Sequence, residues 1–283
     1  MIQDYLNRIL NGNCVEVMNL FPDNCIDLVI TSPPYDNLRT YKGYQFPFEE
    51  IVKQLYRVVK DNGVVVWVVA DATIDGSETC TSFKQALDFV KIGFKLHDTM
   101  IFKKTNPIPQ IYRKRYNNEF EYMFVFVKGN VVTHNAIKVP CLHAGLELNG
   151  TTYKNYSKGE QTRTKLASPV KNDKIKGNIW EYVVGKKAID QESKSHPAPF
   201  PYDLAKDHIL SWSNENDIVL DPMCGSGTTC VAAFDNNRNY IGIDICEEYC
   251  ELATKRMKIH EDNLGMFYYP TQERTIAGSS TSF

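Results

Sequence analysis

Two consecutive prolines follow an apolar run in "VITSPPYDNLRTY", residues 29–41. Proline removes a backbone donor and favours extended geometry in the residue before it, so a buried strand must end here. The tetrad Ser32-Pro33-Pro34-Tyr35 therefore leaves a hydroxyl and an aromatic ring at a rigid strand tip. Both groups could contact a ligand, and the alternative is a turn that only closes the strand.

A second candidate site is the glycine turn in "VLDPMCGSGTTCVAA", residues 219–233. Gly225 and Gly227 allow a tight turn and a close approach of a ligand to the backbone. The stretch lacks the third glycine of a dinucleotide fingerprint and the Gly-Lys-Ser/Thr of a phosphate-binding loop. Asp244 ends the next strand, where an acid of a nucleoside-binding sheet accepts both ribose hydroxyls, or caps the following helix. Acid and turn together indicate an adenosine-containing ligand without a phosphate cradle.

Strands and helices alternate on both sides of these motifs. The apolar patterns predict strands at 25–30, 63–70, 217–221 and 239–244, and helices at 47–60, 82–93, 201–212, about 227–236 and 247–260. Two further strands, 94–104 and 120–129, are expected to be antiparallel at the edge of the sheet. This alternation predicts an α/β fold with a doubly wound, mostly parallel sheet.

The charge is distributed unevenly along the chain. The 283 residues have a formal net charge of −2, but residues 103–194 contain 17 Lys or Arg and only 8 Asp or Glu. The clusters "FKKTNPIPQIYRKR" (102–115) and "KNDKIKGN" (171–178) are interleaved with tyrosines. A basic middle segment in an acidic body favours contact with nucleic acid over a merely solvated face.

The chain resembles the amino-methylating DNA methyltransferases that use S-adenosylmethionine, in the subgroup whose catalytic motif precedes the cofactor motif. That family carries an Asp/Asn/Ser-Pro-Pro-Tyr/Phe/Trp tetrad, which matches residues 32–35, and a glycine-rich cofactor turn, which matches residues 221–229. A third block, "SHPAPFP" (195–201), is similar to the motif that precedes this turn. The family often has Gly-Asp near its start, whereas this chain reads Gly12-Asn13.

The resemblance implies a Rossmann-like sheet with the tetrad at a strand's carboxyl end and the cofactor beside it. Ser32 and the Pro33 carbonyl would accept the hydrogens of an exocyclic amino group, Pro34 would help to stiffen the tip, and the Tyr35 ring would stack on a flipped base. The cofactor-binding residues implied by the family are Asp221, Pro222, Cys224, Gly225, Gly227, Thr228, Thr229, Asp244, His196, Pro197 and Phe200.

Double-stranded DNA is the expected partner, and a cognate restriction endonuclease would be a second one. The expected DNA contacts are Arg39, Lys103, Lys104, Arg113, Lys114 and Arg115. Serine at the first tetrad position favours cytosine N4 over adenine N6 as the target. Methylation of cytosine C5 through Pro140-Cys141, methylation of RNA or of a protein amide, and a catalytically silent DNA-binding subunit stay open as alternatives.

Residues 1–104 are expected to form the catalytic half of the methyltransferase domain and residues 178–262 the cofactor-binding half. Residues 105–177 would be an inserted target-recognition region, and residues 263–283 a disordered tail. Scattered cysteines and histidines give no metal-ligand spacing, and no run of about 20 apolar residues is present. We expect no secretory signal, because the first residues lack a basic stretch followed by an apolar core. We expect a cytoplasmic monomer or homodimer.

Overall fold

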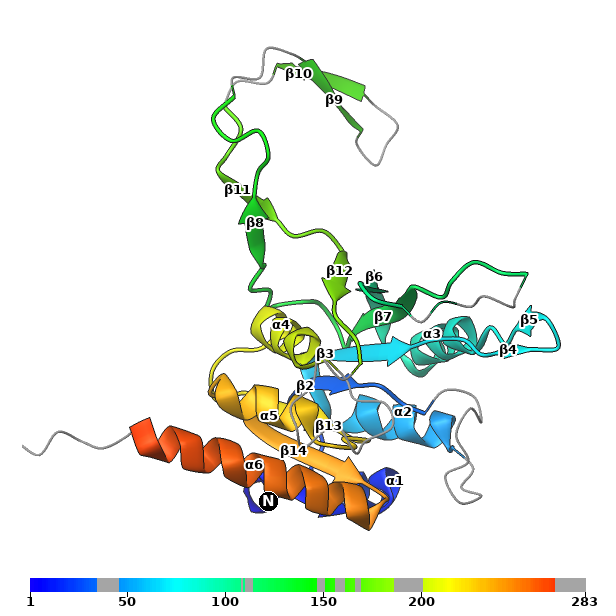
Figure 1. Ribbon diagram of the computed structural model, residues 1–283, viewed down its shortest axis with the longest axis vertical. Helices are drawn as coiled ribbons and strands as arrows, with labels where there is room; N and C mark the ends of the chain where they lie inside the picture. The colour runs from blue at the N-terminus through cyan, green and yellow to red at the C-terminus, as the bar shows by residue number, and fades with distance from the viewer. Residues whose placement is uncertain are drawn as a thin grey trace, which may run out of the picture.

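The computed structural model describes residues 1–34, 46–107, 109, 114–146, 151–155, 161–165, 169–185 and 201–267. An eight-stranded sheet forms the centre of the molecule (Figure 1). Its strands, in spatial order, are β1 (Arg8–Asn11), β14 (Asn239–Asp244), β13 (Ile218–Asp221), β2 (Ile26–Thr31), β3 (Val59–Val69), β7 (Phe120–Val127), β6 (Lys95–Lys104) and β12 (Ile179–Tyr182). All pairs are parallel except those of β7, which confirms the predicted mostly parallel α/β sheet.

The antiparallel strand does not lie at the very edge of the sheet. β7 is inserted between β3 and β6 and runs antiparallel to both, so β6 has the same direction as the other parallel strands. The short strand β12 then pairs with β6 and forms that edge. Lys103 and Lys104, the last residues of β6, therefore lie at the same edge of the sheet as the end of β2.

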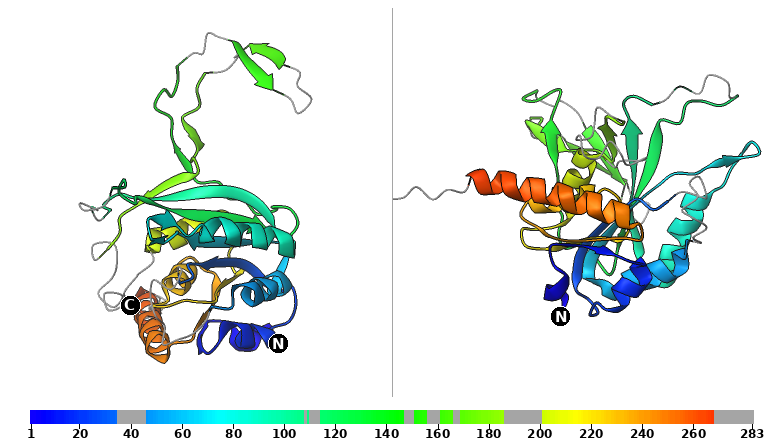
Figure 2. Two further views of the ribbon diagram at one scale, coloured as in Figure 1. Left: turned by 90° about the vertical axis from the view of Figure 1, so that its right-hand side faces the viewer. Right: turned by 60° about the horizontal axis from the view of Figure 1, so that its bottom comes forward.

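Helices cover both faces of the sheet (Figure 2). On one face lie α1 (Cys14–Asn19), α2 (Phe48–Val58) and α3 (Thr81–Ile92), and on the other lie α4 (Tyr202–Trp212), α5 (Thr228–Asp235) and α6 (Glu247–Phe267). Successive residues of β3 point to opposite faces of the sheet. Val65 and Trp67 pack against α2 and α3 on one face, and Val64 and Val66 pack against α4 and α5 on the other. A strand buried on both faces is apolar throughout, which explains the run of valines.

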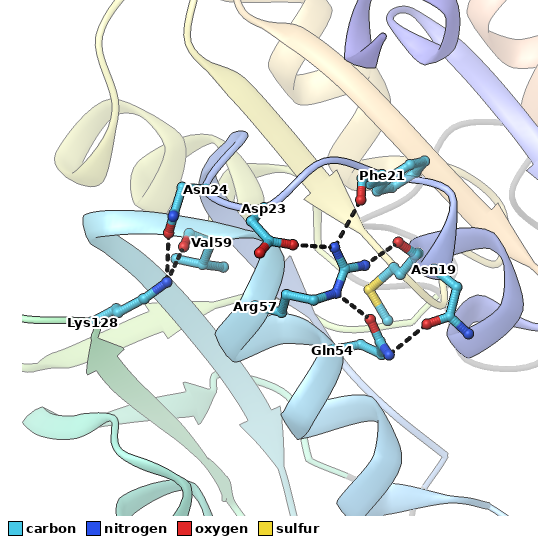
Figure 3. Close-up of polar contacts among 9 residues, drawn as sticks. Asn19, Phe21, Asp23, Asn24, Gln54, Arg57, Val59 and Lys128 are labelled. Carbon is cyan, nitrogen blue, oxygen red and sulfur yellow. Dashed lines mark hydrogen bonds and ion pairs between the residues drawn. The ribbon is translucent and has the colours of Figure 1, made fainter.

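The loop that leads into β2 is fixed by the Arg57 side chain at the end of α2 (Figure 3). Its guanidinium donates to the carbonyl oxygens of Met18 and Phe21 at 2.6 and 2.8 Å and pairs with Asp23 at 2.7 Å. Lys128 at the end of β7 also joins this edge, donating to the Val59 carbonyl at 3.0 Å. These contacts hold the segment that precedes β2 against the end of α2, and the start of β3 against the residue after β7.

Two antiparallel ladders project from the body as an arm (Figure 1). β8 (Lys138–Pro140) pairs with β11 (Asp173–Ile175), and β9 (Thr151–Asn155) pairs with β10 (Gln161–Lys165). We call the described residues 136–146, 151–155, 161–165 and 169–175 the arm. The residues that flank the arm on each side bind α4. The backbone N–H of Asn135 donates to the Ser211 carbonyl at 2.9 Å, and Lys176 pairs with Asp207 at 3.0 Å. A small hairpin, β4 (Thr73–Ile74) with β5 (Ser77–Glu78), follows β3.

Candidate active site

The two motifs that the sequence separates by nearly 190 residues lie side by side. β2 and β13 are neighbouring parallel strands, with Leu28 opposite Val219 and Val29 opposite Leu220. At their carboxyl ends the Thr31 hydroxyl donates to Oδ1 of Asp221 at 2.8 Å, in a buried position. The proline motif therefore begins at the residue after Thr31, and Thr31 is bonded to Asp221, the first residue of the glycine turn. The carboxyl edge is where open α/β sheets bind their ligands.

Within the tetrad, Pro33 is buried, and Ser32 and Pro34 are half-buried at the end of β2. These three residues directly follow Thr31, whose side chain contacts Asp221 at the end of β13. Tyr35 lies outside the described residues. The same holds for Arg39, Arg113, His196, Pro197 and Phe200.

The glycine turn contains two residues in a left-handed backbone conformation that glycine adopts easily. Gly225 has φ of +51° and Gly227 has φ of +78°, both in the left-handed region. A Cβ at Gly227 would lie 2.8 Å from Cβ of Ala253 on α6, so a larger residue would need both strain and displacement. The turn then continues directly into α5, which begins at Thr228.

Asp244 holds this turn from the end of β14. One carboxylate oxygen accepts from the backbone N–H of Gly225 at 2.8 Å, and the other accepts from the N–H of Cys246 at 2.9 Å. Burial raises the pKa of Asp244, and these backbone donors oppose the rise. The helix-capping interpretation of Asp244 therefore describes a real contact, since Cys246 directly precedes α6. With a further backbone hydrogen bond from Ile245, three of about four lone-pair positions are used, which leaves acceptor capacity for a ligand.

Asp221 faces the interior rather than the open edge. Its carboxylate is buried and accepts from the Thr31 hydroxyl and from the backbone N–H of Met223 at 3.2 Å. Burial raises the pKa of Asp221 to about 6, while hydrogen bonds from Thr229 and Thr31 oppose the rise. Its role in the structure is to join β13, β2 and the start of α5.

The other predicted residues of the turn are also buried. Pro222, Cys224, Thr228 and Thr229 are inaccessible or nearly so. The Cys224 thiol lies beside that of Cys230, whose hydrogen bond, together with burial, raises the pKa of Cys224. These side chains pack in the interior under the turn, so a ligand at the carboxyl edge would contact mainly the backbone of the turn.

Two polar residues of this region were not predicted. Thr31 precedes the proline motif, and its only signal is a hydroxyl at the end of an otherwise apolar strand. Arg256 on α6 is 2% exposed and donates to the Ser226 carbonyl and to the Thr228 hydroxyl. Its position within "ATKRMKIH" resembles an ordinary surface charge on an amphipathic helix, so no local pattern distinguishes it.

Gly12-Asn13, which departs from the family pattern, has a local structural role. The N–H of Gly12 donates to the Asp244 carbonyl at 2.9 Å. The Asn13 side chain caps α1 by accepting from the N–H of Val15 at 2.9 Å. Asparagine can make this cap as well as aspartate, so the substitution preserves the local backbone.

The described basic residues at this edge are partly paired with acids. Lys103 pairs with Glu181 at 2.9 Å, and Lys104 pairs with Glu121 at 2.8 Å. Arg115 binds the β4–β5 hairpin through the Gly76 carbonyl, and Glu78 lies 3.5 Å away. Lys114 is exposed, and with Arg115 and Gly76 it borders a shallow cavity of about 520 Å³.

Another cavity, of about 690 Å³, lies at the opposite edge of the sheet. Its lining includes Cys25, Lys60 and Ile218, at the amino ends of β2, β3 and β13. It is therefore remote from the carboxyl edge. In the part of the chain that the structure describes, no group of three or more acids, cysteines or histidines could hold a metal ion. Nor does any helix among those residues have the length and apolarity needed to cross a membrane.

The chain belongs to the DNA methylase family of N6/N4 methyltransferases, whose family model matches residues 26–255. It is 49% identical over 244 residues to the orphan methyltransferase M.BamHII of Bacillus amyloliquefaciens, covering 83% of this chain and 90% of that protein. It is 30% identical over 261 residues to the type II methyltransferase M.BglII of Bacillus subtilis, covering 89% and 69%. The family predicted from the three motifs is thereby confirmed, and the protein is a DNA methyltransferase.

Solved structures share the fold. The PvuII DNA methyltransferase (cytosine-N4-specific) matches with a TM-score of 0.65 at 19% identity, over 90% of this chain and 89% of that one. A DNA modification methylase from Thermus thermophilus, TTHA0409, complexed with S-adenosyl-L-methionine, matches with a TM-score of 0.61 at 22% identity, over 89% and 95%. At such identities the likeness concerns the arrangement of the sheet and its helices.

Proposed function

We propose that this methyltransferase transfers a methyl group from S-adenosylmethionine to the exocyclic N4 of cytosine, at a specific site in duplex DNA. The observation that supports this most directly is the Thr31–Asp221 hydrogen bond between the ends of β2 and β13. It brings the proline motif against the glycine turn, as a transfer between two bound molecules requires. Holding donor and acceptor together is itself a large part of catalysis.

The glycine turn fits an adenosine-containing cofactor. Gly225 presents backbone without a side chain, and Asp244 keeps acceptor capacity for ribose hydroxyls after binding the turn. We assign the rest of the pocket wall to the backbone of the turn at Pro222, Cys224, Thr228 and Thr229, with His196, Pro197 and Phe200 from the preceding block. When bound, S-adenosylmethionine supplies an electrophilic methyl group on a sulfonium.

The proline motif suits an amino group, which is a poor nucleophile because its lone pair is delocalised into the base. Ser32 and the Pro33 carbonyl would accept its hydrogens and favour a pyramidal nitrogen. Pro33 and Pro34 restrict the backbone, so these acceptors need little reorganisation during the reaction. Tyr35 would stack on the flipped base, an interaction of about 1–3 kcal/mol.

We assign DNA contact to residues 105–177, which include the arm, and to the basic residues at the carboxyl edge. Lys114 is exposed, and Arg115 is oriented by the β4–β5 hairpin. Lys103 and Lys104 would exchange their carboxylate partners for phosphates, together with Arg39 and Arg113. Charge reversal at Lys114 should weaken DNA binding and reduce its dependence on salt concentration.

Product analysis tests the proposal. The protein is incubated with S-adenosylmethionine and duplex DNA, and the DNA is digested to nucleosides for mass spectrometry. N4-methylcytosine is the expected product, and it should be lost in the Y35A variant. N6-methyladenine alone would assign the same geometry to adenine, which is the second candidate because both targets are amino groups.

Methylation at cytosine C5 would refute the assigned mechanism. Tight DNA binding without any methyl transfer would instead identify a silent DNA-binding subunit. Because relatives such as M.BglII are type II methyltransferases, we also propose a restriction–modification context, in which an endonuclease cleaving the same unmethylated site would be the partner. Protection of methylated DNA from that cleavage would test it.

A further inference from the structure

Arg256 is a buried cation on the last helix, close to the glycine turn. Its side chain is 2% exposed and lies in the middle of α6, a helix outside the motifs that suggested the function. A guanidinium in such a position needs hydrogen-bond acceptors to replace its hydration. The identity of these acceptors indicates what the residue does.

Three of its acceptors belong to the turn. Nη1 of Arg256 donates to the carbonyl oxygen of Ser226, and it lies 3.2 Å from the Ser226 hydroxyl and 3.2 Å from the Thr228 hydroxyl. Ser226 and Thr228 are the two neighbours of Gly227, and both are buried. One guanidinium nitrogen therefore holds the chain on either side of the left-handed glycine.

The same face of α6 also touches Gly227 directly. Ala253 lies three residues before Arg256, on the same side of the helix. A Cβ at Gly227 would lie 2.8 Å from Cβ of Ala253, so helix and turn are in close contact. Asp244, at the end of β14, holds the N–H of Gly225 from another element of the sheet.

We propose that Arg256 is a positioning residue that sets the shape of the glycine turn for S-adenosylmethionine, an inference that rests on the proposed function. Asp244 fixes the turn by accepting from an N–H group, and Arg256 fixes it by donating to a carbonyl and two hydroxyls. Arginine suits this task because Nη1 carries two N–H donors whose directions are fixed by the guanidinium plane. Lysine would supply the charge with less defined geometry.

The test compares R256M, R256K and the wild-type protein, with K255M as the matched control, because Lys255 is exposed on the same helix. Calorimetry with S-adenosylmethionine and S-adenosylhomocysteine measures cofactor affinity, and fluorescence anisotropy measures DNA affinity. We expect R256M to weaken cofactor binding about tenfold or more, with DNA affinity changed by less than about twofold. R256K should recover part of the loss, and K255M should match the wild type.

Steady-state kinetics give a readout that a purely structural role would not move, and hydrogen exchange reports on the order of the turn itself. R256K should raise KM for S-adenosylmethionine about threefold or more, with kcat within about twofold. Amides of residues 224–229 should exchange faster in R256M, while those of β3 keep their protection.

A folded R256M variant with wild-type cofactor affinity and unchanged exchange at the turn would overturn the inference. If R256M does not fold, the R256K variant is the test, and a wild-type KM of R256K for S-adenosylmethionine would refute the inference. A wild-type protein that binds no S-adenosylmethionine would instead refute the proposed function. The hydrogen-exchange comparison would still show whether Arg256 orders the turn.

Discussion

Replacing Thr31 by valine removes the hydrogen bond that joins the two motif strands while keeping the shape of the side chain. The Thr31 hydroxyl donates to the Asp221 carboxylate at 2.8 Å, and neither side chain is accessible enough for water to replace the bond. Hydrogen bonds to charged groups contribute about 1.5–3 kcal/mol, and those between neutral groups about 0.5–1.5 kcal/mol. The effect of T31V should therefore depend on the ionisation of Asp221.

Burial raises the pKa of Asp221 from an ordinary 3.8 to about 6, so the folded protein binds this proton more tightly than the unfolded chain does. Ionisation of Asp221 hence lowers the stability as pH rises through this interval, by about 3 kcal/mol, and the penalty is constant above it. The Thr31 hydrogen bond stabilises the carboxylate. In T31V the pKa of Asp221 should rise further, and the penalty at high pH should increase.

Urea unfolding, followed by tryptophan fluorescence, measures this difference. We expect T31V to lower the free energy of unfolding by about 2 kcal/mol near pH 8 and by about 1 kcal/mol near pH 5, where Asp221 is mostly protonated. T99V, at an exposed threonine of β6, is the control and should show no such pH dependence. An equal loss at both pH values would refute the assignment of an ionised, hydrogen-bonded Asp221.

Three further substitutions test other parts of the site. D244A removes the acceptor of two backbone N–H groups and should weaken cofactor binding about tenfold by calorimetry, with DNA affinity unchanged; equal cofactor affinity would misplace the pocket. K176M breaks the ion pair between Lys176, next to the arm, and Asp207 on α4, and should weaken DNA binding and speed proteolysis of the arm. An unaltered cleavage pattern would contradict the role of Lys176 in anchoring the arm. G242A would place a Cβ 2.8 Å from Sγ of Cys230 and should lower the free energy of unfolding by about 1–3 kcal/mol, so wild-type stability would show that the packing around β14 can yield.

Much of the fold was predictable because it depends on local patterns. The run of valines in β3, the glycine that ends α3 and the glycine turn before α5 each have a signature within a few residues. Even so, α2 ends at Val58 rather than at residue 60 as predicted, because β3 begins at Val59 by pairing with Ile26 of β2. The short elements β1, β12 and the arm ladders were not predicted, since strands of three to five residues carry little periodicity.

The roles of single polar residues were less predictable than the motifs that contain them. Asp221 is predicted to bind the cofactor, and only the structure shows that its buried carboxylate accepts from the Thr31 hydroxyl. Lys103 and Lys104 are predicted to contact DNA, and only the structure shows that both are also paired with glutamates on neighbouring strands. Such partners are distant in sequence, so neither spacing nor composition reveals them.

The sequence alone determined the residue types that can do the chemistry, the strand and helix that carry each motif, and the α/β class, because backbone conformation and periodicity are local properties. Only the tertiary structure decided that β2 lies beside β13, that β7 is inserted in reverse next to β3, and that Arg256 reaches the glycine turn from the last helix. Periodicity shows which face of an element is buried but not which element covers it. That choice is made by packing and hydrogen bonding between residues that meet only when the whole chain folds.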